Sequence, residues 1–123
     1  MILKKKKVLV CDDNPLIIFM LESLISKKDI EVITAVDGKD GYDKTLTTNF
    51  DFIITDIEMP NMSGWDLIES VQKDGFDIKK TIVISAQLEQ YIIPYAERFG
   101  ILKYYLKPIM PHDIDEIAAL INA

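Results

Sequence analysis

Four short apolar runs in this 123-residue chain each end at a polar or charged residue. Continuous apolar runs of this length are typical of parallel strands buried on both faces, and open α/β sheets place their ligand sites at the carboxyl ends of such strands. The runs and the residues that follow them are Val8 to Cys11 with Asp12-Asp13, Phe52 to Thr55 with Asp56, Thr81 to Ile84 with Ser85, and Tyr104 to Leu106 with Lys107. We therefore expect four distant segments to meet in one pocket.

Segments with helical periodicity alternate with the strands. A further strand is predicted at Glu31 to Ala35 and a helix at Gly38 to Thr47, although Gly41 weakens that helix. Asn14 and Pro15 favour a helix start directly after the first strand. The other apolar helix positions are Ile17, Met20, Leu21, Leu24 and Ile25; Trp65, Ile68 and Val71; Ile92, Tyr95, Ala96 and Phe99; and Ile114, Ile117, Ala118 and Ile121. Five strands and five helices predict one α/β domain over residues 1–123, with a parallel sheet covered on both faces.

Pro94 lies inside the fourth helical pattern, which ends at Gly100. Proline lacks an N–H group and clashes with the carbonyl four residues earlier, so a helix either begins within about a turn of it or bends there. We predict a late start for this helix.

Composition excludes several classes of function. The formal net charge of −6 argues against nucleic-acid binding, because the only concentrated positive charge is Lys4 to Lys7. That run is typical of a solvent-exposed segment that leads into the first strand. Contact with phosphate or anionic lipid is the alternative. The single cysteine, Cys11, fits a reducing cytoplasm, and no 18-residue apolar stretch or signal-peptide pattern occurs. A cytoplasmic protein without membrane insertion is expected.

The predicted pocket would gather the carboxylates of Asp12, Asp13 and Asp56. Each pair of like charges at about 4 Å costs on the order of 4 kcal/mol at an effective dielectric constant near 20, so a cation is needed. Hard carboxylate oxygens suit Mg²⁺, and with one cysteine and the single His112 the chain has no zinc-type cluster. Taken alone, an Asp-Asp pair before a helix more often serves capping, but the strand ends at Asp56, Ser85 and Lys107 favour a shared site.

These segments resemble a bacterial response-regulator receiver domain over essentially the full chain, of the single-domain chemotaxis-regulator kind. The resemblance implies a flavodoxin-like (βα)5 fold with strand order 2-1-3-4-5. It also implies a regulator rather than an enzyme acting on other molecules, with Asp56 accepting a phosphoryl group from the phosphohistidine of a sensor histidine kinase or histidine phosphotransfer protein. The matching segments are Val8-Leu9-Val10-Cys11-Asp12-Asp13-Asn14, Asp56-Ile57-Glu58-Met59-Pro60-Asn61-Met62-Ser63-Gly64, Ser85-Ala86 and Tyr104-Tyr105-Leu106-Lys107-Pro108.

The resemblance also implies roles for single residues. Asp13, Asp56 and the main-chain carbonyl of Glu58 would hold Mg²⁺, with Asp12 helping directly or through water. Lys107, before a cis bond to Pro108, would pair with a phosphate oxygen, and Ser85 would donate a hydrogen bond to another.

The resemblance also implies a conformational switch. Ser85 and Tyr104 would relay phosphorylation to the surface of the fourth helix, fifth strand and fifth helix, where a downstream protein docks and where homodimerisation could occur. Tyr105 should point to the opposite face of the sheet. Pro94 leaves the form of the output surface open.

Several alternatives stay open. The side chain of Glu58 could repel phosphate, pair with Lys107 or reach the metal. The chain could be a receiver-like interaction module without phosphorylation, or an aspartyl-phosphate hydrolase of the haloacid dehalogenase type. The hydrolase is less favoured because Asp12 and Asp13 are adjacent rather than spaced by one residue. The chain could also be a piece of a larger regulator or hybrid kinase.

Overall fold

Five parallel strands form the central sheet of the computed structural model, which describes residues 4–123. Their spatial order is β2-β1-β3-β4-β5, so the predicted flavodoxin-like topology is confirmed. The strands are β1 (Lys6–Cys11), β2 (Ile30–Ala35), β3 (Phe52–Thr55), β4 (Thr81–Ser85) and β5 (Lys103–Leu106). The helices are α1 (Pro15–Ser26), α2 (Gly38–Thr45), α3 (Gly64–Lys73), α4 (Glu89–Phe99) and α5 (Pro111–Asn122), with a short 3-10 helix at Ile78–Lys80.

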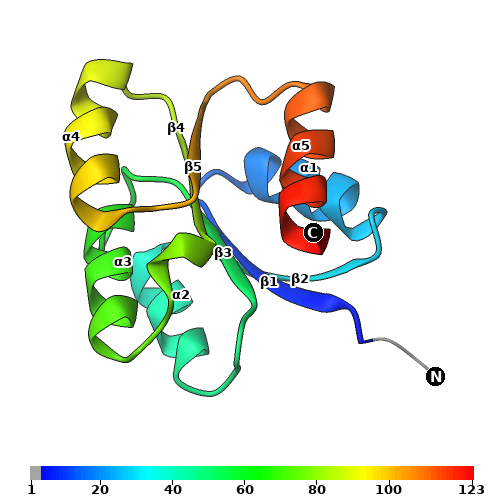
Figure 1. Cartoon of the computed structure of the whole chain (residues 1–123), viewed down its shortest axis with the longest axis horizontal. Coiled ribbons are helices and arrows are strands. Elements are labelled where there is room, and N and C mark those ends of the chain that lie inside the picture. Colours follow the sequence, from blue (N-terminus) through cyan, green and yellow to red (C-terminus); the bar gives the residue numbers. More distant parts are fainter. Residues whose placement is uncertain (1–3) are drawn as a thin grey trace.

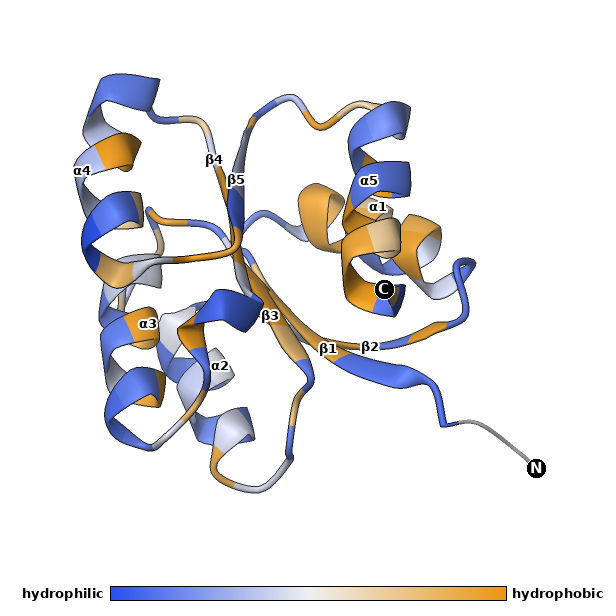
Figure 2. Ribbon diagram, viewed as in Figure 1, coloured by the Kyte–Doolittle hydropathy of each residue, from blue (hydrophilic) through white to orange (hydrophobic). Residues whose placement is uncertain are grey.

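The helices form two layers around the sheet, α1 and α5 on one face and α2, α3 and α4 on the other (Figure 1). Successive strand residues point to opposite faces. Val8 and Val10 accordingly pack under α1 and α5, whereas Leu9 and Cys11 pack under the other three helices. Figure 2 shows hydrophobic residues along much of β1 and β3 in the middle of the sheet, and a mixture of hydrophobic and hydrophilic residues on the helices around it. Both faces of β1 and β3 are thus buried, as their continuous apolar runs predicted.

The predicted helix start after β1 is confirmed. The Asn14 side chain accepts hydrogen bonds from the N–H groups of Leu16, at 2.9 Å, and Ile17, and Pro15 occupies the first turn. These bonds satisfy donors that a helix leaves unpaired at its N-terminus. Asn14 therefore turns the chain from the end of β1 directly into α1, leaving Asp12 and Asp13 at the edge of the sheet.

Gly41 has a packing reason to interrupt α2. A Cβ atom at this position would lie 2.5 Å from the Sγ atom of Cys11, which is buried in the sheet below it. Burial raises the pKa of that thiol well above its usual range. The glycine thus allows α2 to lie close on β1, and Cys11 is a free, buried thiol.

Several element boundaries differ from the predictions. β1 begins at Lys6, β2 at Ile30 and β5 at Lys103, because backbone pairing such as that of Lys6 with Ile30 extends the strands beyond their apolar cores. α2 ends at Thr45, two residues early. Part of the lysine run thus belongs to β1 rather than to an approach segment.

The prediction of a late start for α4 is wrong. This helix begins at Glu89, so Pro94 lies in its interior. A proline there removes the hydrogen bond to the carbonyl of Gln90. Because Gln90 is exposed, water can bind that carbonyl, and the helix continues to its left-handed Gly100 cap.

Across residues 4–123, the structure has no helix with both the length and the apolar character needed to cross a membrane.

Candidate functional site

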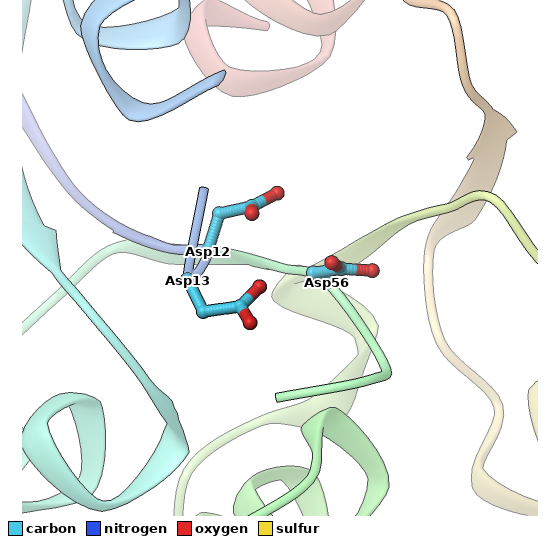
Figure 3. A group of neighbouring side chains, drawn as sticks. All are labelled: Asp12, Asp13 and Asp56. Atoms are coloured by element: carbon cyan, nitrogen blue, oxygen red, sulfur yellow. The ribbon is translucent and has the colours of Figure 1, made fainter. Parts of the chain in front are cut away.

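Three carboxylates meet at the carboxyl edge of the sheet. Asp12 and Asp13 follow β1, and Asp56 follows the neighbouring β3, as Figure 3 shows. One ligand oxygen from each lies within 4.8 Å of the others. This is the position where the strand order reverses, because the chain runs from β1 to β2 on one side and continues through β3 on the other. The predicted juxtaposition of these three residues is present.

Backbone hydrogen bonds fix two of the carboxylates. Asp12 Oδ1 accepts from the N–H of Asn14 at 2.9 Å, and Asp56 Oδ1 accepts from the N–H of Ile57 at 2.7 Å. The N–H of Asp56 in turn donates to the carbonyl of Cys11. Asp12 and Asp56 are only 2% and 8% exposed, whereas Asp13 is exposed. The pocket therefore has a rigid inner wall of two aspartates and an outer, solvated third one.

Lys107 brings a positive charge to the inner wall from the end of β5. Its Nζ atom lies 2.9 Å from Asp12 Oδ2 and 3.1 Å from Asp56 Oδ2. The Lys107-Pro108 peptide bond is cis, as the resemblance implied, and the N–H of Lys107 donates to the carbonyl of Ser85. One ammonium thus bridges both buried carboxylates.

Burial and charge shift the protonation of this group of residues. Burial, with the nearby charge of Asp12, raises the pKa of Asp56 above its usual value although Lys107 opposes the change. For Lys107, burial lowers the pKa, but hydrogen bonds and charge from Asp12 and Asp56 outweigh it and raise the pKa overall. With Lys107 charged and all three aspartates ionised, the pocket has two uncompensated negative charges.

Ser85 lies on the other side of Asp56, at the end of β4, and is 1% exposed. Its Oγ atom accepts a hydrogen bond from the N–H of Gln87 at 3.0 Å. The Gln87 side chain reaches further, and its Nε2 atom donates to Glu58 Oε1 at 2.8 Å. Of the contacts considered for Glu58, pairing with Lys107 is not what the structure has, because the ammonium bonds to the two aspartates instead.

The two tyrosines of β5 point to opposite faces, as predicted. Tyr105 is buried between the sheet and α5, where its hydroxyl donates to Glu116. Tyr104 is half-buried on the α4 side, and its hydroxyl donates to Glu89 Oε2 at 2.9 Å. Tyr104 thus contacts the first turn of α4 rather than the acidic pocket.

Two residues near the site were not singled out by the sequence reasoning. A Cβ atom on Gly64 would lie 2.0 Å from the carbonyl oxygen of Asp56, so only glycine lets α3 start this close to the end of β3. Gln87 is the second. Its position two residues after the strand end at Ser85 was the available signal, because loops at the same edge of a sheet meet there.

Comparison with known proteins identifies the family. A model of the response regulator receiver domain matches residues 8–119, so the chain belongs to the response-regulator receiver family. It is 32% identical, over 90% of its length, to the chemotaxis protein CheY of Thermotoga maritima, of which it covers 92%. The solved structure of the response regulator TrrA of Thermotoga maritima, in complex with Mg²⁺-BeF, has a TM-score of 0.80 and 26% identity, with 94% of this chain and 98% of that one covered.

Other relatives are much longer than this chain. Hybrid signal transduction histidine kinase D of Dictyostelium discoideum is 32% identical over 96% of this chain, which spans only 8% of that protein. Receiver domains thus occur as whole small proteins and as parts of large ones. Membership of this family also argues against the haloacid dehalogenase alternative, whereas a receiver that is not phosphorylated stays an alternative for experiment to decide.

Proposed function

We propose that this domain is a phosphoacceptor switch in which Asp56 takes a phosphoryl group from the phosphohistidine of a sensor histidine kinase or histidine phosphotransfer protein. The observation that carries the proposal is the position of the Asp56 carboxylate, between Lys107 on one side and the pocket beside Ser85 on the other. A carboxylate oxygen attacks phosphorus, an O–P bond forms, and the P–N bond to the donor imidazole breaks. The electron pair stays on that nitrogen, which takes up a proton from solvent.

Asp12, Asp13, Asp56 and the main-chain carbonyl of Glu58 would hold Mg²⁺. The fit rests on donor chemistry and charge, because three carboxylates within 4.8 Å and one ammonium leave two negative charges to neutralise. Hard oxygen donors in a partly solvated pocket suit Mg²⁺ and leave positions for water. When bound, the ion supplies charge neutralisation for the incoming phosphoryl oxygens.

Lys107 and Ser85 would hold the transferred group. The ammonium of Lys107 already contacts Asp56 Oδ2, so it can pair with a phosphoryl oxygen placed there. The Ser85 hydroxyl accepts from Gln87, which leaves its own proton available to donate to another oxygen.

The switch would pass through β4 and β5. Ser85 ends β4, which pairs with β5, and the hydroxyl of Tyr104 in β5 contacts Glu89 in α4. A shift of Ser85 toward a phosphoryl oxygen would favour another position of Tyr104 and so change the α4-β5-α5 surface on which a downstream protein docks. The phosphoryl group can shift this equilibrium only by its differential affinity for the two states.

The donor would dock beside α1. Exposed apolar side chains in this part of the surface are Leu16 and Phe19 of α1 and Val36 after β2, and Phe19 is 69% exposed. Phe19 and Val36 line a shallow depression together with Asp12 and Asp13. An apolar patch beside a charged pocket fits a protein donor better than a small phosphorylated metabolite, because only a protein covers both.

Incubation with acetyl phosphate and Mg²⁺, followed by intact-protein mass spectrometry, tests the proposal. We expect an adduct with the mass of one phosphoryl group that is stable to acid and removed by hydroxylamine. Asp56→Asn should give none, whereas Asp115→Asn, on the exposed side of α5, should match the parent protein. No adduct on the parent, or an equal adduct on Asp56→Asn, would show that the proposal is wrong.

A further inference from the structure

A depression of about 380 Å³ lies at the edge of the sheet where the strands begin, opposite to the acidic pocket. It is bordered by the segment between α2 and β3 and by the end of α3, and these two helices lie side by side on one face of the sheet (Figure 1). Its volume falls in the range of small-molecule sites, about 300–1,000 Å³. The chemistry proposed above uses no residue of this depression.

The lining of the depression has an apolar part and a polar part. Phe50 and Phe76 are half-buried and pack against the core, and Val71 of α3 is buried. The polar part includes Asp74, which is exposed, and Thr45. A ligand that has both an apolar body and a polar group therefore fits this lining better than an inorganic ion does.

The electrostatic surroundings of the depression are negative. α2 ends at Thr45 and α3 at Lys73, and the carboxyl end of a helix carries a partial negative charge from its aligned peptide dipoles. Asp74 directly follows α3 and adds a full negative charge. The chain as a whole has a formal net charge of −6. These charges attract a cation and repel an anion.

The lysines in the last turns of the two helices do not neutralise Asp74. The ammonium of Lys44 donates to the carbonyl of Thr34 at 2.6 Å, and the ammonium of Lys73 pairs with Glu69 at 3.2 Å. Both charges are thus directed to other partners, and the carboxylate beside the depression stays available.

The Asp74 carboxylate is also held in position. Its Oδ2 atom accepts a hydrogen bond from the Tyr42 hydroxyl at 2.8 Å, so a side chain of α2 orients a group at the end of α3. The second oxygen, Oδ1, can accept from a ligand.

We infer that this depression is a binding site for a small organic cation, an amidinium, guanidinium or ammonium group carried on an aromatic or aliphatic body. The charged group bonds to Asp74, and the body packs on Phe50 and Phe76. The aromatic rings add attraction for the cation itself. The site lies at the opposite edge of the sheet from Asp56, and the inference does not rest on the proposed function.

The test is a titration with three aromatic probes of similar size, followed through backbone amide shifts in two-dimensional NMR at constant ionic strength. Benzamidine carries a positive charge, benzyl alcohol none and benzoate a negative one. The amides of Gly75 and Phe76 report on the depression, and those of Asn14 and Ile57 report on the acidic pocket. Benzamidine should give saturable shifts at Gly75 and Phe76. Benzyl alcohol should bind there roughly two to five times more weakly, the worth of one exposed ion pair, and benzoate should give no saturable shift.

Two variants with the same change of charge locate the interaction. Asp74→Asn removes the carboxylate beside the depression and should weaken benzamidine binding roughly two- to fivefold. Asp77→Asn is the matched control, because Asp77 is exposed outside the lining and asparagine can keep the hydrogen bond from the N–H of Lys79. It should bind benzamidine as the parent does. Thermal unfolding verifies that both variants are folded.

Each outcome decides for or against the site. Saturable benzamidine shifts at Gly75 and Phe76 that Asp74→Asn alone weakens support it. Shifts confined to Asn14 and Ile57 overturn it, because the cation then binds only the acidic pocket. Equal binding of benzyl alcohol or benzoate, or equal weakening in both variants, also overturns it, because the Asp74 carboxylate would then not select the ligand.

Discussion

Asp13→Asn should stabilise the folded domain when no divalent cation is present. Asp13 lies within 4.8 Å of ligand oxygens on both Asp12 and Asp56, so it takes part in two of the three repulsive pairs in the pocket. Because Asp13 is exposed, the dielectric constant of water is the better choice, and each pair then costs about 0.9 kcal/mol at 4.8 Å. Removing one charge should therefore raise the free energy of unfolding by about 1–2 kcal/mol.

The same variant should lose most of the stabilisation that Mg²⁺ gives. A ligand that binds only the folded state stabilises it by RT ln(1 + [L]/Kd), so a weaker site gives a smaller gain. The assay is urea unfolding in low salt, with EDTA and then with excess Mg²⁺. We expect Asp13→Asn to be the more stable protein in EDTA, and Mg²⁺ to narrow or reverse that difference.

Glu97→Gln is the matched control, because it changes the net charge equally at an exposed position in α4. It should differ little from the parent in either condition. If Asp13→Asn were no more stable than the parent in EDTA, or if Mg²⁺ stabilised both proteins equally, the electrostatic account of the pocket would be refuted.

Three further predictions concern other parts of the molecule. The folded-state pKa of Asp56 lies above its ordinary value of 3.8, so the parent loses stability as pH rises from about 4 toward neutral. Asp56→Asn lacks this loss. In urea unfolding, the free energy of unfolding of the variant should therefore increasingly exceed that of the parent as pH rises above about 4, and the excess should vanish below pH 4. Gly41→Ala should destabilise the fold by about 1 kcal/mol, since overpacking outweighs the gain in helix propensity. In a Cys11→Ala background the cost should disappear, whereas additive effects in urea unfolding would contradict the contact. Trp65 stacks on Tyr95 of α4 with ring centroids 5.3 Å apart, so its fluorescence should change when Mg²⁺ and beryllium fluoride are added. A flat titration would mean that α4 does not respond.

The fold and the inner pocket could be predicted because their signals are local and repeated. An apolar run followed by a charged residue fixes both the strand and the edge of the sheet where that residue lies, and parallel strands bring such ends together. Asp12, Asp56 and Lys107 meet for this reason, although they come from three separate segments. The inward faces of α1 and α5 followed from periodicity alone.

The remaining features depend on contacts between distant residues, which periodicity does not report. Gly41 weakens α2 as an isolated helix, and only the position of Cys11 beneath it explains why the glycine is there. Pro94 was expected to delay α4, but an exposed carbonyl in the preceding turn makes an interior proline tolerable. Gln87 belongs to no periodic pattern, so its bond to Glu58 required the loops to be placed in space.

Displacing α4 would cost less than displacing α3, whose loop also borders the pocket, and this is why we favour α4 as the output of the switch. Ile92 is its one fully buried side chain, whereas α3 buries Leu67, Ile68 and Val71. Exposing one isoleucine costs about 1.5–3 kcal/mol, and exposing three such residues costs proportionally more. Ligand-driven coupling between two sites is typically about 1–3 kcal/mol, enough to shift a helix held like α4 but not one held like α3. Because the loop that follows Ser85 leads directly into α4, a phosphoryl group on Asp56 would act on a helix that resists displacement less than α3 does.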